Sequence, residues 1–167
     1  MTRMSEEKLS SKNRIMVAIL LVGAVLTVLN QTIISPALPV IMADLGAAAS
    51  TAQWLTSGYS LVNAIIIPVT AYFMSRFTTK RLFIASMGFF FVGSAIAMWG
   101  PSFTFLLIGR LVQAVSAGML IPMVMTVLLL IFPRSKRGFA MGLYNLVICA
   151  APAIGPVASG AMTDTIG

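Results

Sequence analysis

Long apolar segments alternate with short polar connections along this chain of 167 residues. A helix needs about 20 mostly apolar residues to cross about 30 Å of hydrocarbon. Five segments meet this requirement, at approximately 15–41, 53–75, 82–100, 103–132 and 139–161. Because the connections are short, they predict antiparallel neighbours in a bundle. The pattern therefore predicts an all-α polytopic membrane protein, with a polar tail at residues 1–14 and a transmembrane domain at 15–167.

Composition supports the bilayer as the solvent of this chain. Hydrophobic residues make up 59% and charged residues 9% of the sequence, and the mean hydropathy is +0.99. A soluble protein has about 25% charged residues. There is no histidine, and Cys149 is the only cysteine. An internal disulfide and a His/Cys metal site are thereby excluded, and we expect no metal, no cofactor and no enzymatic activity, since no nucleophile–base pair is visible.

The basic residues indicate an orientation in the membrane. All but one of them lie before the first apolar segment or in two of the connections, namely Arg3, Lys8, Lys12, Arg14, Arg76, Lys80, Arg81, Arg134, Lys136 and Arg137. The opposite connections, around Asp44, Pro101 and Asp164, contain no Lys or Arg. By the positive-inside rule the N-terminus is cytoplasmic and residue 167 extracytoplasmic, in a multi-pass protein of the cell membrane. A nucleic-acid surface would have no reason to alternate with membrane spans, so we expect no nucleic-acid partner.

The remaining basic residue, Arg110, falls inside the segment 103–132. It is the only formal charge deep in an apolar segment, about 10 Å from the outer end and so about 20 Å above the inner face. Asn30, in the first segment, lies at a similar height of about 22 Å. Asn30, Gln31 and Arg110 could therefore meet in a polar cavity. The alternatives are an arginine that reaches the membrane interface and amides that only join helices.

Two further segments carry polar or helix-bending residues. Asn63 lies in 53–75, and Gln113 follows Arg110 by one helical turn. We include both, together with Thr32, among the candidate cavity residues. In 139–161, Ala151, Gly155 and Ser159 recur every four residues as a stripe of small side chains, which allows close helix packing. Pro152 and Pro156 remove backbone donors there, so this helix is either a hinge or a tight packing contact.

Four motifs together resemble the major facilitator superfamily, in particular its fourteen-helix drug:proton antiporter branch (EmrB/QacA-like). "LNQTIISPALP" resembles the branch's first-helix motif L-D-x-T-x-x-x-x-A-L-P, and "AYFMSRFTTKRL" stands at the place of the loop motif G-x-L-a-D-r-x-G-r-k. "GRLVQAVSAG" resembles R-x-x-q-G-x-g of the fourth helix. "GLYNLVICAAPAIGPVASG" is similar to the antiporter motif of the fifth helix, G-x8-G-x3-G-P-x2-G-G.

The resemblance implies residue roles, with some departures. Arg110 would organise the substrate cavity, lined by Asn30, Gln31, Thr32, Asn63 and Gln113. The loop motif keeps its basic residues Arg76, Lys80 and Arg81 but lacks both glycines and the aspartate. The antiporter motif keeps Gly142, Gly155, Pro156 and Gly160, with Ala151 and Ser159 in place of glycines. Asn30 replaces the acid of the first-helix motif, so we expect either that the proton-carrying group lies on helices outside this chain or that the coupling differs.

The resemblance also implies an activity. We expect the N-terminal part of a secondary multidrug efflux transporter, in which amphipathic drugs leave in exchange for protons. Halves of this superfamily have six helices each, so five helices imply an incomplete N-terminal half whose partners are the remaining transporter helices and the lipid bilayer. Such a fragment should not transport alone. The alternative is a small, non-transporting membrane scaffold or subunit derived from a transporter.

Overall fold

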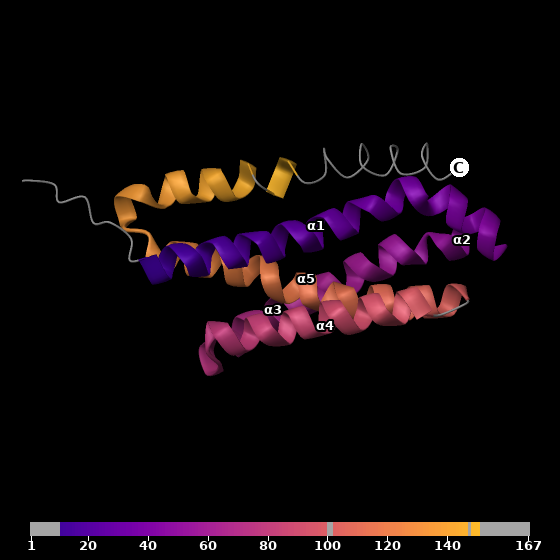
Figure 1. Cartoon of the computed structure of the whole chain (residues 1–167), viewed down its shortest axis with the longest axis horizontal. Coiled ribbons are helices and arrows are strands. Elements are labelled where there is room, and N and C mark those ends of the chain that lie inside the picture. The colour runs from indigo at the N-terminus through magenta and orange to yellow at the C-terminus, as the bar shows by residue number, and fades with distance from the viewer. Residues whose placement is uncertain (1–10, 100–101, 147, 151–167) are drawn as a thin grey trace, which may run out of the picture.

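The computed structural model describes residues 11–99, 102–146 and 148–150, and these residues are helical almost throughout. The elements are α1 (Ser11–Leu45), α2 (Ala49–Ala52), α3 (Trp54–Arg76), α4 (Thr79–Trp99), α5 (Phe103–Ile131) and the 3-10 turn η1 (Arg134–Lys136). Helical residues follow at 137–146 and 148–150. Figure 1 shows the long helices running roughly lengthwise, with α5 in the middle. The all-α fold class predicted from the sequence is confirmed.

Four helical segments in the described part of the chain are long and apolar enough to cross a membrane. They are Asn13–Leu45, Ala49–Arg76, Thr79–Trp99 and Phe103–Ile131. Each lies at the position of an expected span. The fifth expected span, 139–161, lies only partly within the described residues. Four residues of its motif lie entirely outside them, namely Ala151, Gly155, Pro156 and Gly160. The proposed hinge or packing stripe of that segment lies outside them as well.

Helix α1 is longer than the apolar segment that predicted it. Its 35 residues correspond to about 52 Å of helix, more than the hydrocarbon core requires. Pro36 and Pro39 lie inside it, and the helix bends toward this C-terminal end (Figure 1), as expected where a ring replaces a backbone donor. Gly46 then ends it at φ 58°. The N–H of Ala47 donates to the carbonyl of Met42 at 3.2 Å, which is the glycine-ended cap of many helices.

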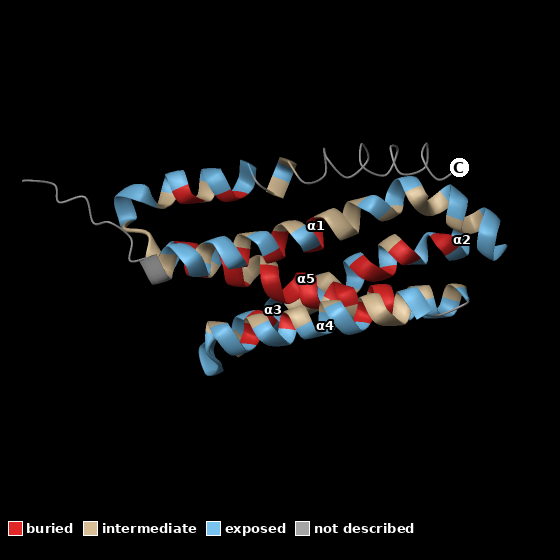
Figure 2. Ribbon diagram, viewed as in Figure 1, coloured by how far each residue is buried: buried red, intermediate tan, exposed pale blue. Residues whose placement is uncertain are grey.

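Helix α5 is the core of the bundle. It packs against α1, α3 and α4, and Figure 2 shows the buried residues concentrated along it. The buried side chains include Leu120, Met123 and Val124 of α5, together with Leu55 of α3. The outer faces of α1, α3 and α4 expose large apolar side chains such as Val22, Ile65 and Phe91. Outside a membrane such faces would be unstable, whereas lipid tails match them.

The contact between α4 and α5 brings the two backbones together. A Cβ atom placed on Gly93 would lie 2.7 Å from the carbonyl oxygen of Gly109. A Cβ on Gly109 would lie 2.6 Å from the carbonyl oxygen of Gly93. Further along the same interface, the hydroxyls of Ser86 and Ser116 are 3.1 Å apart, and Ser86 also donates to the carbonyl of Ser116 at 3.2 Å. Small residues thus allow a close helix crossing fixed by polar contacts.

The helix that follows η1 packs on the same core. Tyr144 is buried in a cluster with Leu128 of α5, and Met141 and Ile148 cover that cluster from outside. Gly142 is exposed, and a Cβ at this position would meet nothing within 4 Å. Of the antiporter-motif residues, only Gly142 lies among the described residues, and it makes no close helix contact there.

Candidate functional site

Arg110 lies at the centre of the bundle, with a side chain only 2% exposed. Its Nη1 donates to both oxygens of Asn30 on α1, the carbonyl oxygen at 3.1 Å and the side-chain Oδ1 through a short bond. It also donates to Oε1 of Gln113, three residues along α5, at 3.2 Å. The structure therefore brings together the arginine and the amide that the sequence placed at one height.

The network continues from α5 to α4. The side-chain Nε2 of Gln113 donates to Oγ of Ser94 at 2.9 Å. Ser94 in turn donates to the carbonyl of Phe90 at 2.8 Å. Because Asn30, Gln113 and Ser94 come from three different helices, the polar cluster joins α1, α5 and α4. Ser94 was not predicted from the sequence, since hydropathy says nothing about which residues meet across two helices.

Tyr59 of α3 covers one face of the Arg110 guanidinium. The guanidinium carbon lies 4.7 Å from the centre of the Tyr59 ring, and this tyrosine is only 1% exposed. A cation over an aromatic face gains an attraction of about 2 kcal/mol where water is excluded. The sequence analysis missed Tyr59. A usable signal was its position one turn before Asn63, which places both on one face of α3.

The other predicted cavity residues do not join this cluster. The Thr32 hydroxyl donates to the carbonyl of Leu29 within α1, at 3.0 Å. Gln31 is half-buried, and its side chain makes no hydrogen bond to other described residues. The side-chain Oδ1 of Asn63 is buried and has no hydrogen-bond partner among the described residues. The structure thus unites Asn30, Arg110 and Gln113 and leaves Gln31, Thr32 and Asn63 outside the network.

The basic loop motif lies at the opposite end of α3, away from the cluster. Arg76, Lys80 and Arg81 are exposed around the connection between α3 and α4. The Arg76 guanidinium lies 5.8 Å from the ring centre of Tyr72, one turn earlier. These side chains are available to lipid headgroups or to other parts of the protein.

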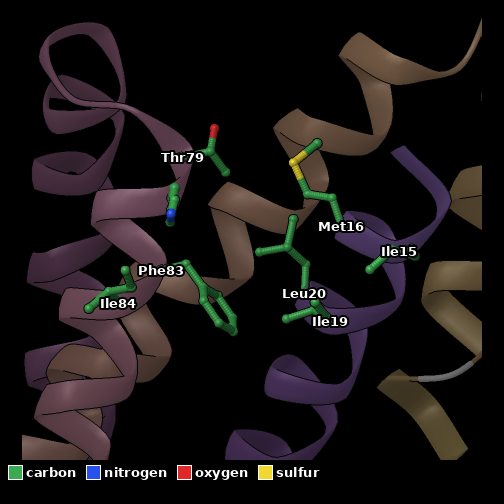
Figure 3. Close-up of a pocket in the computed structure, with 8 residues that line it drawn as sticks. Ile15, Met16, Ile19, Leu20, Thr79, Phe83 and Ile84 are labelled. Atoms are coloured by element: carbon green, nitrogen blue, oxygen red, sulfur yellow. The ribbon is translucent and has the colours of Figure 1, made fainter. Parts of the chain in front are cut away.

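A separate apolar groove of about 390 Å³ opens between α1 and α4 (Figure 3). Its lining residues are Ile15, Met16, Ile19, Leu20, Thr79, Lys80, Phe83 and Ile84. Leu20 is ten residues from Asn30, which corresponds to about 15 Å along the helix. The groove is therefore distinct from the Arg110 cluster, and its lining matches hydrocarbon rather than a polar ligand.

Among residues 11–99, 102–146 and 148–150, no group of three His, Cys, Asp or Glu side chains lies together. The chemistry available at the Arg110 cluster is hydrogen bonding by amides and a hydroxyl around one fixed positive charge. Such a cluster can bind and orient a polar ligand, because its donors and acceptors are held in place before the ligand arrives.

Known proteins are similar to this chain in sequence. A family model described as Major Facilitator Superfamily matches residues 20–167. The chain is 45% identical over 150 residues to the lincomycin resistance protein LmrB of Bacillus subtilis, covering 90% of this chain and 31% of LmrB. It is 37% identical over 139 residues to the multidrug export protein EmrB of Haemophilus influenzae, covering 83% of this chain and 27% of EmrB.

A third relative is the uncharacterized MFS-type transporter YcnB of Bacillus subtilis, 47% identical over 146 residues, which are 87% of this chain and 31% of YcnB. The chain thus spans less than a third of the length of these relatives. The apolar helices of a multi-pass membrane protein, the motifs in their expected order and the match over residues 20–167 agree. This chain belongs to the Major Facilitator Superfamily.

Proposed function

We propose that this chain forms the N-terminal part of a secondary multidrug exporter, which exchanges amphipathic drugs for protons. The observation that carries the proposal is the polar cluster around Arg110, the one buried formal charge among the described residues of a mostly apolar bundle. A charge at this depth is costly, and such charges in membrane helices mark substrate or ion pathways. The relatives named for lincomycin resistance and multidrug export support drugs as the substrate class.

In this proposal Arg110 organises the cavity, and Asn30 and Gln113 hold its guanidinium in place. Gln31, Thr32 and Asn63 line the substrate path on either side of the cluster. The side-chain Oδ1 of Asn63, which has no partner among the described residues, supports this role, because a buried acceptor gains from a partner that a ligand can bring. The remaining transporter helices, as partners of this chain, would close the other side of the path.

The proton-carrying group is assigned to a part of the protein beyond this chain. Asn30 does not titrate in the physiological range. Asp44 is the only acidic side chain among the described residues, and it is exposed near the end of α1. It lies 14 residues beyond Asn30, or about 21 Å along the helix. Neither residue fits a proton site at the level of Arg110.

The orientation follows from the positive-inside rule. The N-terminus and the basic loop residues Arg76, Lys80 and Arg81 face the cytoplasm in this proposal, where the loop residues latch the cytoplasmic side of the transporter. Residue 167 faces the outside of the cell membrane. A cysteine placed at residue 167 should react with a membrane-impermeant maleimide on intact cells, and reaction only after lysis would reverse the assignment.

The test of function is Arg110→Met in the protein at its native length. Methionine keeps much of the side-chain volume and removes the charge and the hydrogen bonds to Asn30 and Gln113. We expect energised cells carrying this variant to extrude ethidium no faster than cells without the transporter. The measurement is ethidium fluorescence after glucose is added to loaded cells.

The matched control is Arg134→Met, which removes an exposed arginine from η1. It should extrude ethidium at the unmodified rate. Both variants are compared at equal amounts in the membrane. Unchanged efflux by Arg110→Met would contradict the proposed role of the cluster.

A further inference from the structure

We propose that the groove between α1 and α4 binds one anionic phospholipid, with an acyl chain between the two helices and the phosphate at Lys80. This is the apolar groove of about 390 Å³ whose lining residues Figure 3 shows. The site goes beyond the proposed drug transport and does not depend on it. It follows from the position of the groove, from its lining and from the positive charge beside it.

The groove lies at the end of the bundle where both helices begin. Its walls are the stretch of α1 from Ile15 to Leu20 and the first turns of α4, from Thr79 to Ile84. Further along α1 the two helices meet, because a Cβ atom on Gly23 would lie 3.1 Å from the Phe83 side chain and 3.6 Å from that of Met87. The space therefore ends where the helices touch, and it has the position of the upper part of a lipid acyl chain.

The walls of the groove are hydrocarbon. Leu20 is buried in it, whereas Ile15, Ile19 and Ile84 remain at least half exposed. An acyl chain fits such walls, but it gains little there over the bilayer, since lipid tails are as apolar as leucine. The walls thus accept any phospholipid of suitable shape, and a preference for one class must come from the headgroup.

Lys80 provides the means of selecting a headgroup. It is a lining residue of the groove and is exposed. A lysine near a helix end lays its stem along apolar surface and places its ammonium group at the headgroups. Arg14, directly before Ile15, and Arg81 are exposed at the same end. Basic pockets between membrane helices bind the headgroups of anionic lipids, so hydrocarbon walls and a basic rim together match both parts of such a lipid.

Other occupants match the groove less well. A helix from the rest of the protein, or from a second copy, would fit the walls but would bring apolar surface to Lys80. Asp44, the one acidic side chain among the described residues, lies 30 residues beyond Arg14 on the same helix, or about 45 Å along it. Charge complementarity therefore favours the phosphate of a lipid.

The binding experiment uses the protein at its native length, released from detergent micelles for native mass spectrometry. The probes are palmitoyl-oleoyl phosphatidylglycerol and the phosphatidylcholine with the same two chains. We expect the first phosphatidylglycerol to bind about tenfold or more tightly than the first phosphatidylcholine, which corresponds to about 1.4 kcal/mol. Equal affinities would overturn the proposal, and this result is also expected if another helix or a second copy fills the groove.

The role of the charge is tested by Lys80→Gln. It should weaken binding of the first phosphatidylglycerol by about fivefold, which corresponds to the contribution of about 1 kcal/mol from one basic residue near an anionic surface. Lys80→Arg keeps the charge and should retain the affinity. The matched control is Lys136→Gln, which removes an exposed lysine of η1 that does not line the groove. Equal losses in the two glutamine variants would contradict the proposal, because net charge alone would then attract the lipid.

The role of the groove is tested by Ile19→Trp, which fills the space of the acyl chain and leaves every charge in place. The affinity for the first phosphatidylglycerol should fall by about tenfold, since the added ring overpacks the site. Leu26→Trp is the matched control, because Leu26 lies outside the groove lining on the same helix and is 51% exposed, against 50% for Ile19. Unchanged binding by Ile19→Trp would contradict the proposal. These measurements need neither drug nor proton gradient, so their failure is distinguishable from a failure of efflux.

Discussion

Two faces of α5 meet their neighbours in different ways. Toward α4 the contact is between backbones, with Gly93 and Gly109 so close that neither has room for a methyl group. Toward α1 the contact near Asn30 is made by the long side chain of Arg110, which reaches across to two oxygens. The first contact is steric and has little freedom. The second depends on hydrogen bonds, which can be exchanged for bonds to water or to a ligand.

The difference separates a fixed part of the bundle from an adaptable one. We expect helices α4 and α5 to move as one unit, because a small shift would press the backbone of one glycine against the carbonyl of the other or open a gap. Helix α1 has a polar contact that survives small displacements, since an arginine has several rotatable bonds and several donors. A ligand at Arg110 would therefore change the position of α1 more readily than that of α4.

The largest effect on stability is expected for Gly93→Ala. Its Cβ would lie 2.7 Å from the Gly109 carbonyl, so the two helices must separate, at a cost of about 1–3 kcal/mol. Reversible unfolding by SDS in mixed micelles measures this change. Gly88→Ala is the control on the same helix, because its Cβ would meet nothing within 4 Å. An equal loss in the free energy of unfolding for the two variants would show that the close approach of Gly93 to Gly109 gives this position no special role in stability.

An intermediate effect is expected for Ser86→Ala in the same interface. The substitution removes the hydrogen bonds to the hydroxyl and the carbonyl of Ser116. Polar contacts between membrane helices are worth about 0.6 kcal/mol on average, so the free energy of unfolding should fall by about that amount. Ser57→Ala, at an exposed position of α3, should leave it unchanged. A loss as large as that of Gly93→Ala would mean that the serines, and not the glycines, dominate this contact.

The smallest effect on stability is expected for Arg110→Met, although it should abolish efflux. The variant loses hydrogen bonds to Asn30 and Gln113 but also removes a buried charge that has no counter-charge in the described chain. These effects oppose each other, and replacement of buried ions by apolar side chains is often neutral. In the same SDS unfolding assay we expect a change in the free energy of unfolding smaller than that of Ser86→Ala. Strong destabilisation would make Arg110 part of the rigid core.

The helical architecture was predictable because the bilayer imposes it. Apolar segments of sufficient length must be helical to satisfy their backbone groups, so the sequence located α1, α3, α4 and α5. The exact ends of the helices were harder to predict from the sequence. Helix α1 continues past residue 41 to Leu45, since the cap at Gly46 depends on backbone conformation rather than hydropathy.

The candidate site was predictable only in part. Counting residues from the ends of two segments placed Asn30 and Arg110 at one height, and the structure joins them. The same count could not give rotation about each helix axis. Gln31, next to Asn30, therefore lies outside the network, whereas Tyr59 and Ser94 belong to it. Contacts across helices depend on small residues such as Gly93, whose effect appears only when the neighbouring helix is known.

The two prolines of α1 have a consequence for hydration. A proline has no N–H, so Pro36 gives no helical donor to the carbonyl of Thr32, and Pro39 gives none to the carbonyl of Ser35. Both oxygens follow Asn30 along the same helix. They add two backbone acceptors to a segment whose side chains are otherwise mostly apolar. Water that enters beside α1 can therefore be bound by the main chain itself, and the wet part of this helix extends beyond its polar side chains.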